Sequence, residues 1–534
     1  MEYKRHLKPA ANSENVLSIL LKMSFKIKPQ NTSEKPGDFC EGLNFTTTEF
    51  SAKILRWINI IITTIMIKIK LIYPPNLSDK RVTNTPPLGI AQLAGSLTSK
   101  GYKVDLEDLN ALCEHKGIDV SIFSDNHTDK LESFISGSNS DIENVISEIL
   151  RDFEYKSYDV LGFSIIGFYN FKIALVLAKK IKEENKNIVI VFGGSFITFY
   201  EHQLLDDFDF IDYVIFGMAE ESFYNLITHL EGKNDVSCVD NLIHRTKTGI
   251  KRNKPKRFDL ENSPLPVFDN FFSKDYCAYI KRIPYLVGVG CNNRCAFCTD
   301  CLVYPFAVKS PLKVVSDLKI LSGRYKNNKV FLHCNNLHVG NYIEEFCDLL
   351  IKNKLNLNWG ASLLLKNLSN NTLQKMKAAG NTHIATGIES ASPRLLSKMN
   401  KRLCLEECEE ILKNARQTKI DVRLNFIVGF PGESDTDFKY TVDFVKRNFQ
   451  CITDIKVDSF GLIKKSMVAQ HPERYGITKI WTPVNGLFAK YYPSYNFSET
   501  NISDDIRSKT VAERIRSLEK AVCNNNIRFF TRSL

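Results

Sequence analysis

Long apolar runs are missing from this sequence of 534 residues. The apolar stretch Ile54–Ile67 gives way to lysines well short of the about 20 residues that a membrane-spanning helix needs. It also lies too far from the first residue for a signal peptide, and it lacks a small-residue cleavage site. The sequence therefore predicts no membrane span and a cytoplasmic location.

A nucleic-acid-binding motif is also missing. The net charge of +11 is spread along the chain, with only short basic runs such as Lys251–Arg257. No aromatic-basic motif accompanies these runs, so a solvated, lysine-rich surface is the simpler interpretation. No nucleic-acid partner is expected.

The 14 cysteines include no second pair with the spacing of a zinc knuckle, although structural zinc usually takes four ligands from two separated pairs. Scattered cysteines without a signal peptide are typical of a reducing cytosol rather than of a disulfide framework. Cys404 and Cys408 lie one helical turn apart, a spacing that is easily incidental. One local group of three cysteines remains to be explained.

That group lies in Gly290–Cys298 and has C-x3-C-x2-C spacing. Three thiolates on one tight loop can hold three irons of a [4Fe–4S] cubane and leave the fourth iron open to a substrate or cofactor. Cys301 could instead close the cluster as a fourth ligand, and structural zinc is a further alternative. The spacing favours an open cluster with the ligands Cys291, Cys295 and Cys298.

Strand and helix patterns alternate from Met66 onward. Apolar residues alternate with lysines from Ile67 to Leu71, and Pro87 opens an amphipathic helix that Gly101 ends. Further strands are predicted at 102–106, 160–164, 188–192 and 213–216, with helices at 142–153 and 171–182. This alternation favours a parallel, doubly wound sheet whose ligand crevice lies at its carboxyl edge.

From Tyr285 the chain repeats strand–helix units again. Strands are predicted at the cluster loop and at 329–334, 357–364, 383–389, 422–429 and 454–462. About six such units are typical of a partial (β/α)6 barrel, and active sites of such barrels lie at the carboxyl ends of the strands.

The cysteine spacing, with Phe297 just before the last cysteine, resembles the cluster loop of the radical SAM superfamily. In that family the open iron binds the amino and carboxylate groups of S-adenosylmethionine (SAM), and one electron splits SAM to a 5′-deoxyadenosyl radical. The segment from Met66 to Gly232 resembles the cobalamin-binding domain of one large class of the family. The resemblance implies a [4Fe–4S] cluster, SAM and cobalamin as cofactors.

The histidine motif D-x-H-x-x-G, which ligates cobalt in other cobalamin domains, is absent, and His115 has neither its aspartate nor its spacing. The radical SAM class commonly binds cobalamin without it. Glycines at the strand ends would permit close approach of the corrin or its nucleotide tail. The resemblance implies cobalamin contacts at Pro87, Gly89, Gly193, Gly194, Ser195, Gly217 and Glu220. A Rossmann-like domain without a ligand is the alternative.

Two further stretches resemble the family near SAM, Gly387–Ser390 and Gly429–Glu433. Arg423 could pair with the SAM carboxylate or could be a simple surface arginine. The implied SAM contacts are Phe297, Gly387, Glu389, Ser390, Arg423, Asn425, Gly429, Pro431 and Gly432. His333 and Cys334, at the end of the second barrel strand, are the candidates for catalysis, although a buried, inert cysteine is the commoner case.

We expect five regions. They are an extension that is poorly ordered or precedes the true start (1–65), the cobalamin-type domain (66–235), a linker with one hairpin (236–280), the radical SAM barrel (281–480), and an aromatic segment (481–534). The last segment could cap the barrel mouth or could be ordinary packing.

The resemblance favours a cobalamin-dependent methyltransferase that acts on an unactivated carbon of a small molecule or peptide. In such enzymes one SAM remethylates cobalt and a second supplies the radical. Radical rearrangement, cyclisation or oxidation is the runner-up, and a non-catalytic iron–sulfur or cobalamin sensor is the alternative from another class. A reducing partner such as flavodoxin or ferredoxin is implied. No additional three-cysteine cluster domain and no RNA-binding barrel are recognised, which argues against a methylthiotransferase.

Overall fold

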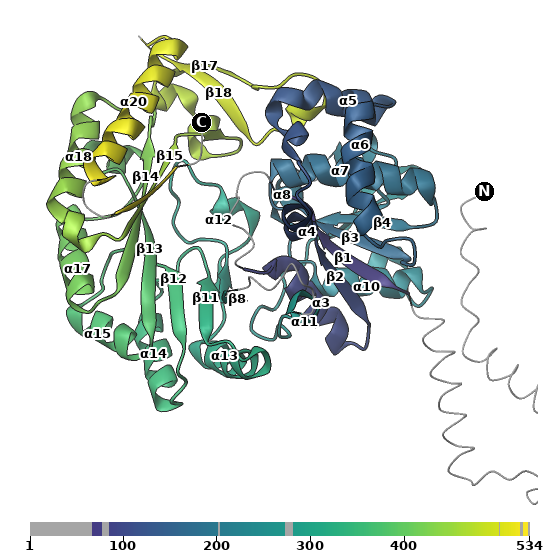
Figure 1. Cartoon of the computed structure of the whole chain (residues 1–534), viewed down its shortest axis with the longest axis horizontal. Helices are drawn as coiled ribbons and strands as arrows, with labels where there is room; N and C mark the ends of the chain where they lie inside the picture. Colours follow the sequence, from purple (N-terminus) through teal and green to yellow (C-terminus); the bar gives the residue numbers. More distant parts are fainter. Residues whose placement is uncertain are drawn as a thin grey trace, which may run out of the picture.

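The structure is a computed structural model, and it describes residues 67–76, 85–200, 203–272, 281–500, 502–523 and 527–531. Two α/β units lie side by side, with α12 (Asp300–Val303) between them (Figure 1). The expected extension 1–65 lies outside the described residues, as do residues 273–280 of the expected linker.

The first unit is a seven-stranded sheet with the order β2-β1-β3-β4-β5-β6-β7. The first five strands are parallel, as the sequence predicts, and the last two extend the sheet as an antiparallel hairpin. The strands are β1 (Ile69–Tyr73), β2 (Val104–Asp108), β3 (Val160–Ser164), β4 (Val189–Gly193), β5 (Tyr213–Ile215), β6 (Leu242–Thr246) and β7 (Gly249–Arg252).

Helices cover both faces of this sheet because its strands are apolar on both sides. Ile69 and Leu71 of β1 belong to the core beneath α3 and α10, whereas Ile72 belongs to the core beneath α5, α6 and α7. The helices are α3 (Leu88–Ser99), α4 (Leu109–Lys116), α5 (Thr128–Ser136), α6 (Ser140–Asp152), α7 (Phe168–Glu184), α8 (Ser195–Tyr200), α9 (Leu204–Asp207) and α10 (Glu220–Leu230).

The second unit is an open parallel barrel with the order β8-β11-β12-β13-β14-β15-β19. Buried residues alternate with half-buried ones along β14, so Leu424 and Phe426 pack against the outer helices while Arg423 and Asn425 face the barrel interior. The strands are β8 (Ile283–Leu286), β11 (Lys329–His333), β12 (Asn358–Ser362), β13 (Asn381–Glu389), β14 (Asp421–Val428), β15 (Asp454–Ser459) and β19 (Arg528–Thr531).

Five long helices and α20 surround the barrel, and serine side chains cap the starts of some of them. The Ser310 hydroxyl caps α13, and Ser434 and Asp437 form a capping box at α18. The helices are α13 (Pro311–Tyr325), α14 (Tyr342–Lys352), α15 (Asn370–Ala378), α17 (Leu405–Gln417), α18 (Asp435–Asn448) and α20 (Asp504–Cys523).

Two of the expected boundaries lie elsewhere in the structure. The hairpin expected in the linker belongs to the first sheet, where β6 pairs with β5. In the tail, β19 pairs with β15 and adds a seventh strand to the six predicted. Both differences have one cause, since exposed sheet edges gain backbone hydrogen bonds by adding further strands.

Part of the aromatic tail packs against the first unit, while α20 and β19 pack against the barrel. Phe488 and Tyr491 are buried in the core around α7, and the Tyr491 hydroxyl donates to Asp207 (2.6 Å). Tyr492 donates to Asp125 (2.9 Å). The tail, which includes β17 (Ile477–Trp481) and β18 (Ser494–Glu499), thereby connects the two units across the top of Figure 1.

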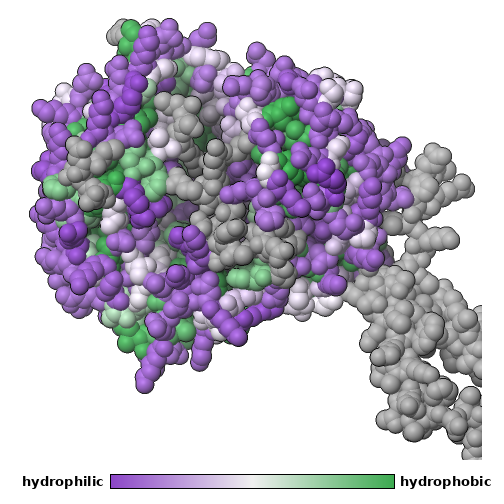
Figure 2. Space-filling view, viewed as in Figure 1, coloured by the Kyte–Doolittle hydropathy of each residue, from purple (hydrophilic) through white to green (hydrophobic). Residues whose placement is uncertain are grey.

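No helix in the described ranges is long and apolar enough to cross a membrane. Hydrophilic side chains cover most of the face shown in Figure 2, and its apolar residues form small, separate patches.

Candidate functional site

A cavity of about 730 Å³ lies between the two units. One wall comes from the carboxyl ends of β1, β3, β4 and β5, and the opposite wall comes from the carboxyl ends of β8, β11 and β12. All seven residues expected to contact cobalamin line this cavity, namely Pro87, Gly89, Gly193, Gly194, Ser195, Gly217 and Glu220. Both catalytic candidates, His333 and Cys334, line it as well. The tertiary structure therefore brings these separate loops to one space.

Two glycines that line this cavity have left-handed backbone conformations that other residues rarely adopt. Gly194 has a φ of 107°, and a Cβ there would lie 2.3 Å from the Ile165 carbonyl oxygen. Gly217 has a φ of 72°. Thr198 ties the two loops together, because its hydroxyl accepts from the Gly217 N–H (2.9 Å) and donates to the Gly194 carbonyl (2.9 Å). Thr198 carried no signal in the sequence.

Glu220 begins α10 and is only 5% exposed. Its Oε2 has no hydrogen-bond partner among the described residues, and burial raises the pKa of Glu220 to about 7. An unsatisfied, buried polar atom that faces a cavity costs free energy unless a ligand supplies a partner.

The cysteine loop is held by its backbone. The Ala296 N–H donates to the Met399 carbonyl (2.8 Å), and the Val468 N–H donates to the Ala296 carbonyl (3.1 Å). Ala296 is fully buried, which fixes the middle of the loop while the three cysteines on either side stay half-buried. Met399 directly follows α16 (Pro393–Lys398) and Val468 belongs to α19 (Met467–Gln470), so two distant segments hold one loop.

Among the described residues, no group of three or more His, Cys, Asp or Glu side chains is close enough together to hold a single metal ion. A cubane spaces its thiolates farther apart, because each thiolate binds a different iron. Burial raises the pKa of Cys298 to about 12 and also raises the pKa of Cys295. Binding to iron would have to offset this cost, since the thiolate is the ligand form.

Gly290 allows the loop to begin where it does. Its φ is 67°, and a Cβ would lie 2.3 Å from the Tyr304 carbonyl oxygen. We expect Gly290→Ala to destabilise the loop by at least about 1–2 kcal/mol, because of the left-handed backbone and the clash, and to lower the iron bound after anaerobic reconstitution. Gly323→Ala, at an exposed helix position with no atom within 4 Å, is the control and should raise stability by about 0.5–1 kcal/mol. Unchanged iron content in Gly290→Ala would contradict this expectation.

Several expected SAM contacts do face the barrel interior. Gly387 and Glu389 lie on the inner side of β13, and Asn425 lies on the inner side of β14. Glu389 accepts from Lys401 (3.1 Å), and Lys401 is close enough to Cys295 to oppose the rise of its pKa. The inner side of β13 therefore lies beside the cysteine loop.

Asp458 of β15 is a residue that the sequence analysis missed. Oδ1 of Asp458 and Oδ1 of Asn425 are both buried without a hydrogen-bond partner among the described residues, on adjacent strands. A sequence signal for Asp458 was available, because Lys456 and Asp458 alternate with the apolar residues Ile455 and Val457 and so share one face of the strand. Two such acceptors suit an ammonium or ribose hydroxyl group, which needs them.

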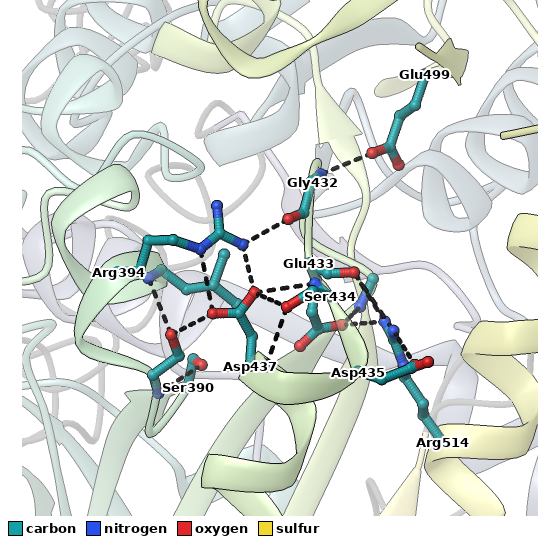
Figure 3. A network of polar contacts seen from close by, with 12 residues as sticks. Ser390, Arg394, Gly432, Glu433, Ser434, Asp435, Asp437, Glu499 and Arg514 are labelled. Atoms are coloured by element: carbon teal, nitrogen blue, oxygen red, sulfur yellow. Dashed lines mark hydrogen bonds and ion pairs between the residues drawn. The ribbon is translucent and has the colours of Figure 1, made fainter. Parts of the chain in front are cut away.

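The loop Gly429–Gly432 is held by the polar network in Figure 3. The Gly429 N–H donates to Glu433 (2.7 Å), which is paired with Arg514 (3.0 Å), and the Gly432 N–H donates to Glu499 (2.6 Å). Burial raises the pKa of Glu433 to about 7 despite Arg514. A network of this kind fixes the loop, including Pro431, against the strand ends.

Two expected SAM contacts lie differently. Ser390 is 1% exposed and its hydroxyl accepts from the Ser392 N–H (3.1 Å), so it stabilises the turn after β13. Arg423 is near the start of β14, where it pairs with Asp454 (3.7 Å) and lies over the Phe530 ring. The alternation identified the inner face of β14 correctly but not the depth of Arg423 in the barrel, and its contact with the SAM carboxylate stays a prediction.

The catalytic candidates have different environments. Burial lowers the pKa of His333 to about 4, so this imidazole is neutral near pH 7. Cys334 is 7% exposed, burial raises its pKa to about 11, and its thiol donates to the Asn336 carbonyl (3.3 Å). Phe297 is half-buried against the core that surrounds Ala296. His333 is thus a neutral hydrogen-bonding group at the cavity wall.

Two family models match the chain. The radical SAM superfamily model matches residues 285–445, and the B12 binding domain model matches residues 77–227. The chain is a radical SAM enzyme with an N-terminal B12-binding domain. Its cofactors are accordingly a [4Fe–4S] cluster, SAM and cobalamin, and members of the superfamily require an electron donor.

Curated relatives are similar over both units of this radical SAM enzyme. An uncharacterized methyltransferase of Pyrococcus horikoshii is 26% identical over 394 residues, which are 72% of this chain and 78% of the relative. The anaerobic magnesium-protoporphyrin IX monomethyl ester cyclase of Rubrivivax gelatinosus is 26% identical over 367 residues, which are 66% of this chain and 60% of the relative.

Solved structures share the fold of the radical SAM enzyme. The cobalamin-dependent SAM radical enzyme OxsB, with aqua-cobalamin and SAM bound, has a TM-score of 0.64 at 14% identity and covers 85% of this chain and 67% of its own. The radical SAM methyltransferase TsrM from Kitasatospora setae, with cobalamin and a [4Fe–4S] cluster bound, has a TM-score of 0.63 at 15% identity. The match covers 88% of this chain and 92% of the TsrM chain. Both likenesses confirm the predicted α/β architecture.

Proposed function

We propose that this radical SAM enzyme transfers a methyl group from SAM to an unactivated carbon of a small molecule or peptide. The single observation that carries the proposal is the cavity, which the loops of the B12-binding domain and the carboxyl ends of three barrel strands share. A cofactor held by one wall would therefore face a substrate held by the other. The methyltransferase name of the Pyrococcus horikoshii relative supports the same reaction.

The residues fit the implied cofactors. We propose Cys291, Cys295 and Cys298 as cluster ligands, leaving one iron open for SAM. Asn425 and Asp458 each supply an Oδ1 for SAM that has no partner among the described residues, and Gly387 and Glu389 lie beside them. Gly429–Gly432 is held rigidly enough to border the adenine.

The first domain fits cobalamin in the same way. Gly89, Gly193, Gly194 and Gly217 keep the strand ends free of side chains, so a flat corrin can approach the backbone. Bound there, cobalamin would supply methyl-transfer chemistry, and SAM cleavage would supply the hydrogen-abstracting radical. The chain itself encloses the reacting groups, and neutral His333 can orient a substrate by a hydrogen bond.

The overall reaction is balanced with two SAM molecules and two electrons. One C–H bond of the substrate and two S–C bonds of SAM break, and one C–C bond of the product and the C–H bond of 5′-deoxyadenosine form. The products are the methylated substrate, 5′-deoxyadenosine, methionine and S-adenosylhomocysteine. A reducing protein such as flavodoxin or ferredoxin supplies both electrons.

Product analysis tests this proposal. The enzyme, reconstituted anaerobically with iron, sulfide and cobalamin and reduced with dithionite, should convert SAM to both S-adenosylhomocysteine and 5′-deoxyadenosine, measured by mass spectrometry. Formation of 5′-deoxyadenosine without S-adenosylhomocysteine would instead favour a radical cyclisation or oxidation, which the cyclase relative makes the second candidate. Neither product from a protein with an intact cluster would leave only the sensor interpretation.

A further inference from the structure

The acid at the start of α10 is unusual in its position. Glu220 is 5% exposed, lines the cavity between the two units and leaves Oε2 without a hydrogen-bond partner among the described residues. Its main-chain carbonyl accepts from the Ser96 hydroxyl of α3 (3.1 Å), which fixes the residue between these two helices. The backbone of Glu220 is therefore held in place while one of its carboxyl oxygens stays available.

The groups around Glu220 do not neutralise it. From α3 the neighbours Gln92 and Ser96 do not titrate, and from the barrel side the titratable groups that interact with Glu220 electrostatically are Lys309 and Tyr304. Lys309 donates to the Tyr285 hydroxyl oxygen (3.1 Å), and burial lowers its pKa to about 8. Burial therefore outweighs the attraction of Lys309, and the pKa of Glu220 rises to about 7.

The simpler role of an acid in the first turn of a helix is to interact with the helix dipole. Glu221, the next residue, fits that role, because its carboxylate is partly exposed and pairs with Lys256 (2.9 Å). Glu220 differs because it is turned into the cavity and has no basic partner in a salt bridge within the described ranges. The dipole does not require such burial, so a ligand is the better explanation.

We propose that Glu220, as a neutral carboxylic acid, is a positioning residue that donates a hydrogen bond to an uncharged acceptor of cobalamin. The proposal rests on cobalamin binding in this cavity and goes beyond it by assigning a protonation state and a contact. Only the protonated acid can donate, whereas an ionised carboxylate could only accept. The acceptor is an amide carbonyl of the corrin side chains or a base nitrogen of the nucleotide tail.

Cobalamin affinity as a function of pH tests the proposal without turnover. The purified protein with its cluster is titrated with hydroxocobalamin, and the dissociation constant is taken from the absorbance change. Wild-type affinity should be highest below about pH 7 and should fall by about tenfold in total over roughly one to two pH units above it, since deprotonation removes a donor worth about that factor. Other ionisations of the apo protein are controlled by the variants below.

Three variants separate the hydrogen bond from general effects. Glu220→Gln keeps a donor that does not titrate, so its affinity should stay near the low-pH wild-type value and lose the pH dependence. Glu220→Ala should bind about tenfold more weakly at low pH, the value of one hydrogen bond. Glu221→Gln, on the exposed side of the same helix, should behave like wild type. Cluster iron and thermal unfolding of each variant show that it is folded.

Cobinamide, which lacks the nucleotide tail, identifies the acceptor. If the loss in Glu220→Ala persists with cobinamide, the acceptor is a corrin amide, and if it disappears, the acceptor is in the tail. The proposal is overturned if folded Glu220→Ala binds hydroxocobalamin as tightly as wild type, or if Glu220→Gln keeps the wild-type pH dependence. Wild-type protein that binds neither corrinoid would instead overturn cobalamin binding itself.

Discussion

Cys298→Ala is expected to reduce the cluster content of the reconstituted enzyme to less than about a tenth and to abolish 5′-deoxyadenosine formation. The loop offers three thiols at C-x3-C-x2-C spacing, and a cubane that loses one of three protein ligands is left with two exposed irons. The backbone bonds at Ala296 do not depend on the thiol, so the barrel should remain folded. Iron and sulfide analysis, the absorbance of the cluster and thermal unfolding check the three expectations.

Cys301→Ala is the matched control. Cys301 is half-buried on α12, near enough to Cys295 to affect its pKa, and it is the thiol that the sequence analysis gave as a possible fourth ligand. If only Cys291, Cys295 and Cys298 bind the cluster, Cys301→Ala should keep its full iron content and should still cleave SAM. If Cys301→Ala lowers SAM cleavage or iron as strongly as Cys298→Ala does, the cluster is not open at one iron in the way that we propose.

Gly89→Leu is expected to weaken cobalamin binding about 10- to 100-fold, because the new side chain would occupy the cavity. Gly89 lies in the first turn of α3, and a Cβ there would meet only the Ser164 hydroxyl at 3.3 Å, so the backbone need not move. A leucine also favours the helix by about 0.5–1 kcal/mol relative to glycine. The stability of the apo protein, measured by thermal unfolding, should therefore be kept or raised. The affinity for cobalamin, measured by absorbance titration, should be weakened.

Gly323→Leu provides the comparison for this variant. Gly323 is an exposed helical position on α13, where a Cβ would have no atom within 4 Å, and it does not line the cavity. It should gain the same helix stabilisation and bind cobalamin like wild type. Equal binding by Gly89→Leu and wild type would show that cobalamin does not occupy this part of the cavity.

Much of the fold could be predicted because its signals are local. Apolar alternation located the five parallel strands of the first sheet and six strands of the barrel. β6, β7 and β19 were not assigned to their sheets, since their pairing depends on which sheet edge the fold leaves available. Pairing partners far apart in the chain leave no local pattern.

The candidate site likewise combines features that local sequence patterns predict with features that depend on tertiary contacts. The cysteine spacing and the glycine-rich strand ends are local patterns, and each could be recognised without knowing its surroundings. Thr198 and Asp458 were missed because their roles depend on neighbours from other strands. The pairing of Arg423 with Asp454 could not be predicted, because period two gives the face of a strand but not the level at which a partner lies.

The sequence by itself determined the family and the elements, because thiol spacing, glycine at strand ends and apolar periodicity are properties of short segments. Only the tertiary structure decided that the seven residues predicted to contact cobalamin share one cavity with the barrel, and that Glu220 is buried there with one carboxylate oxygen unpartnered among the described residues. Burial and proximity depend on how two units pack against each other. That packing sets the pKa of Glu220, which no local pattern encodes.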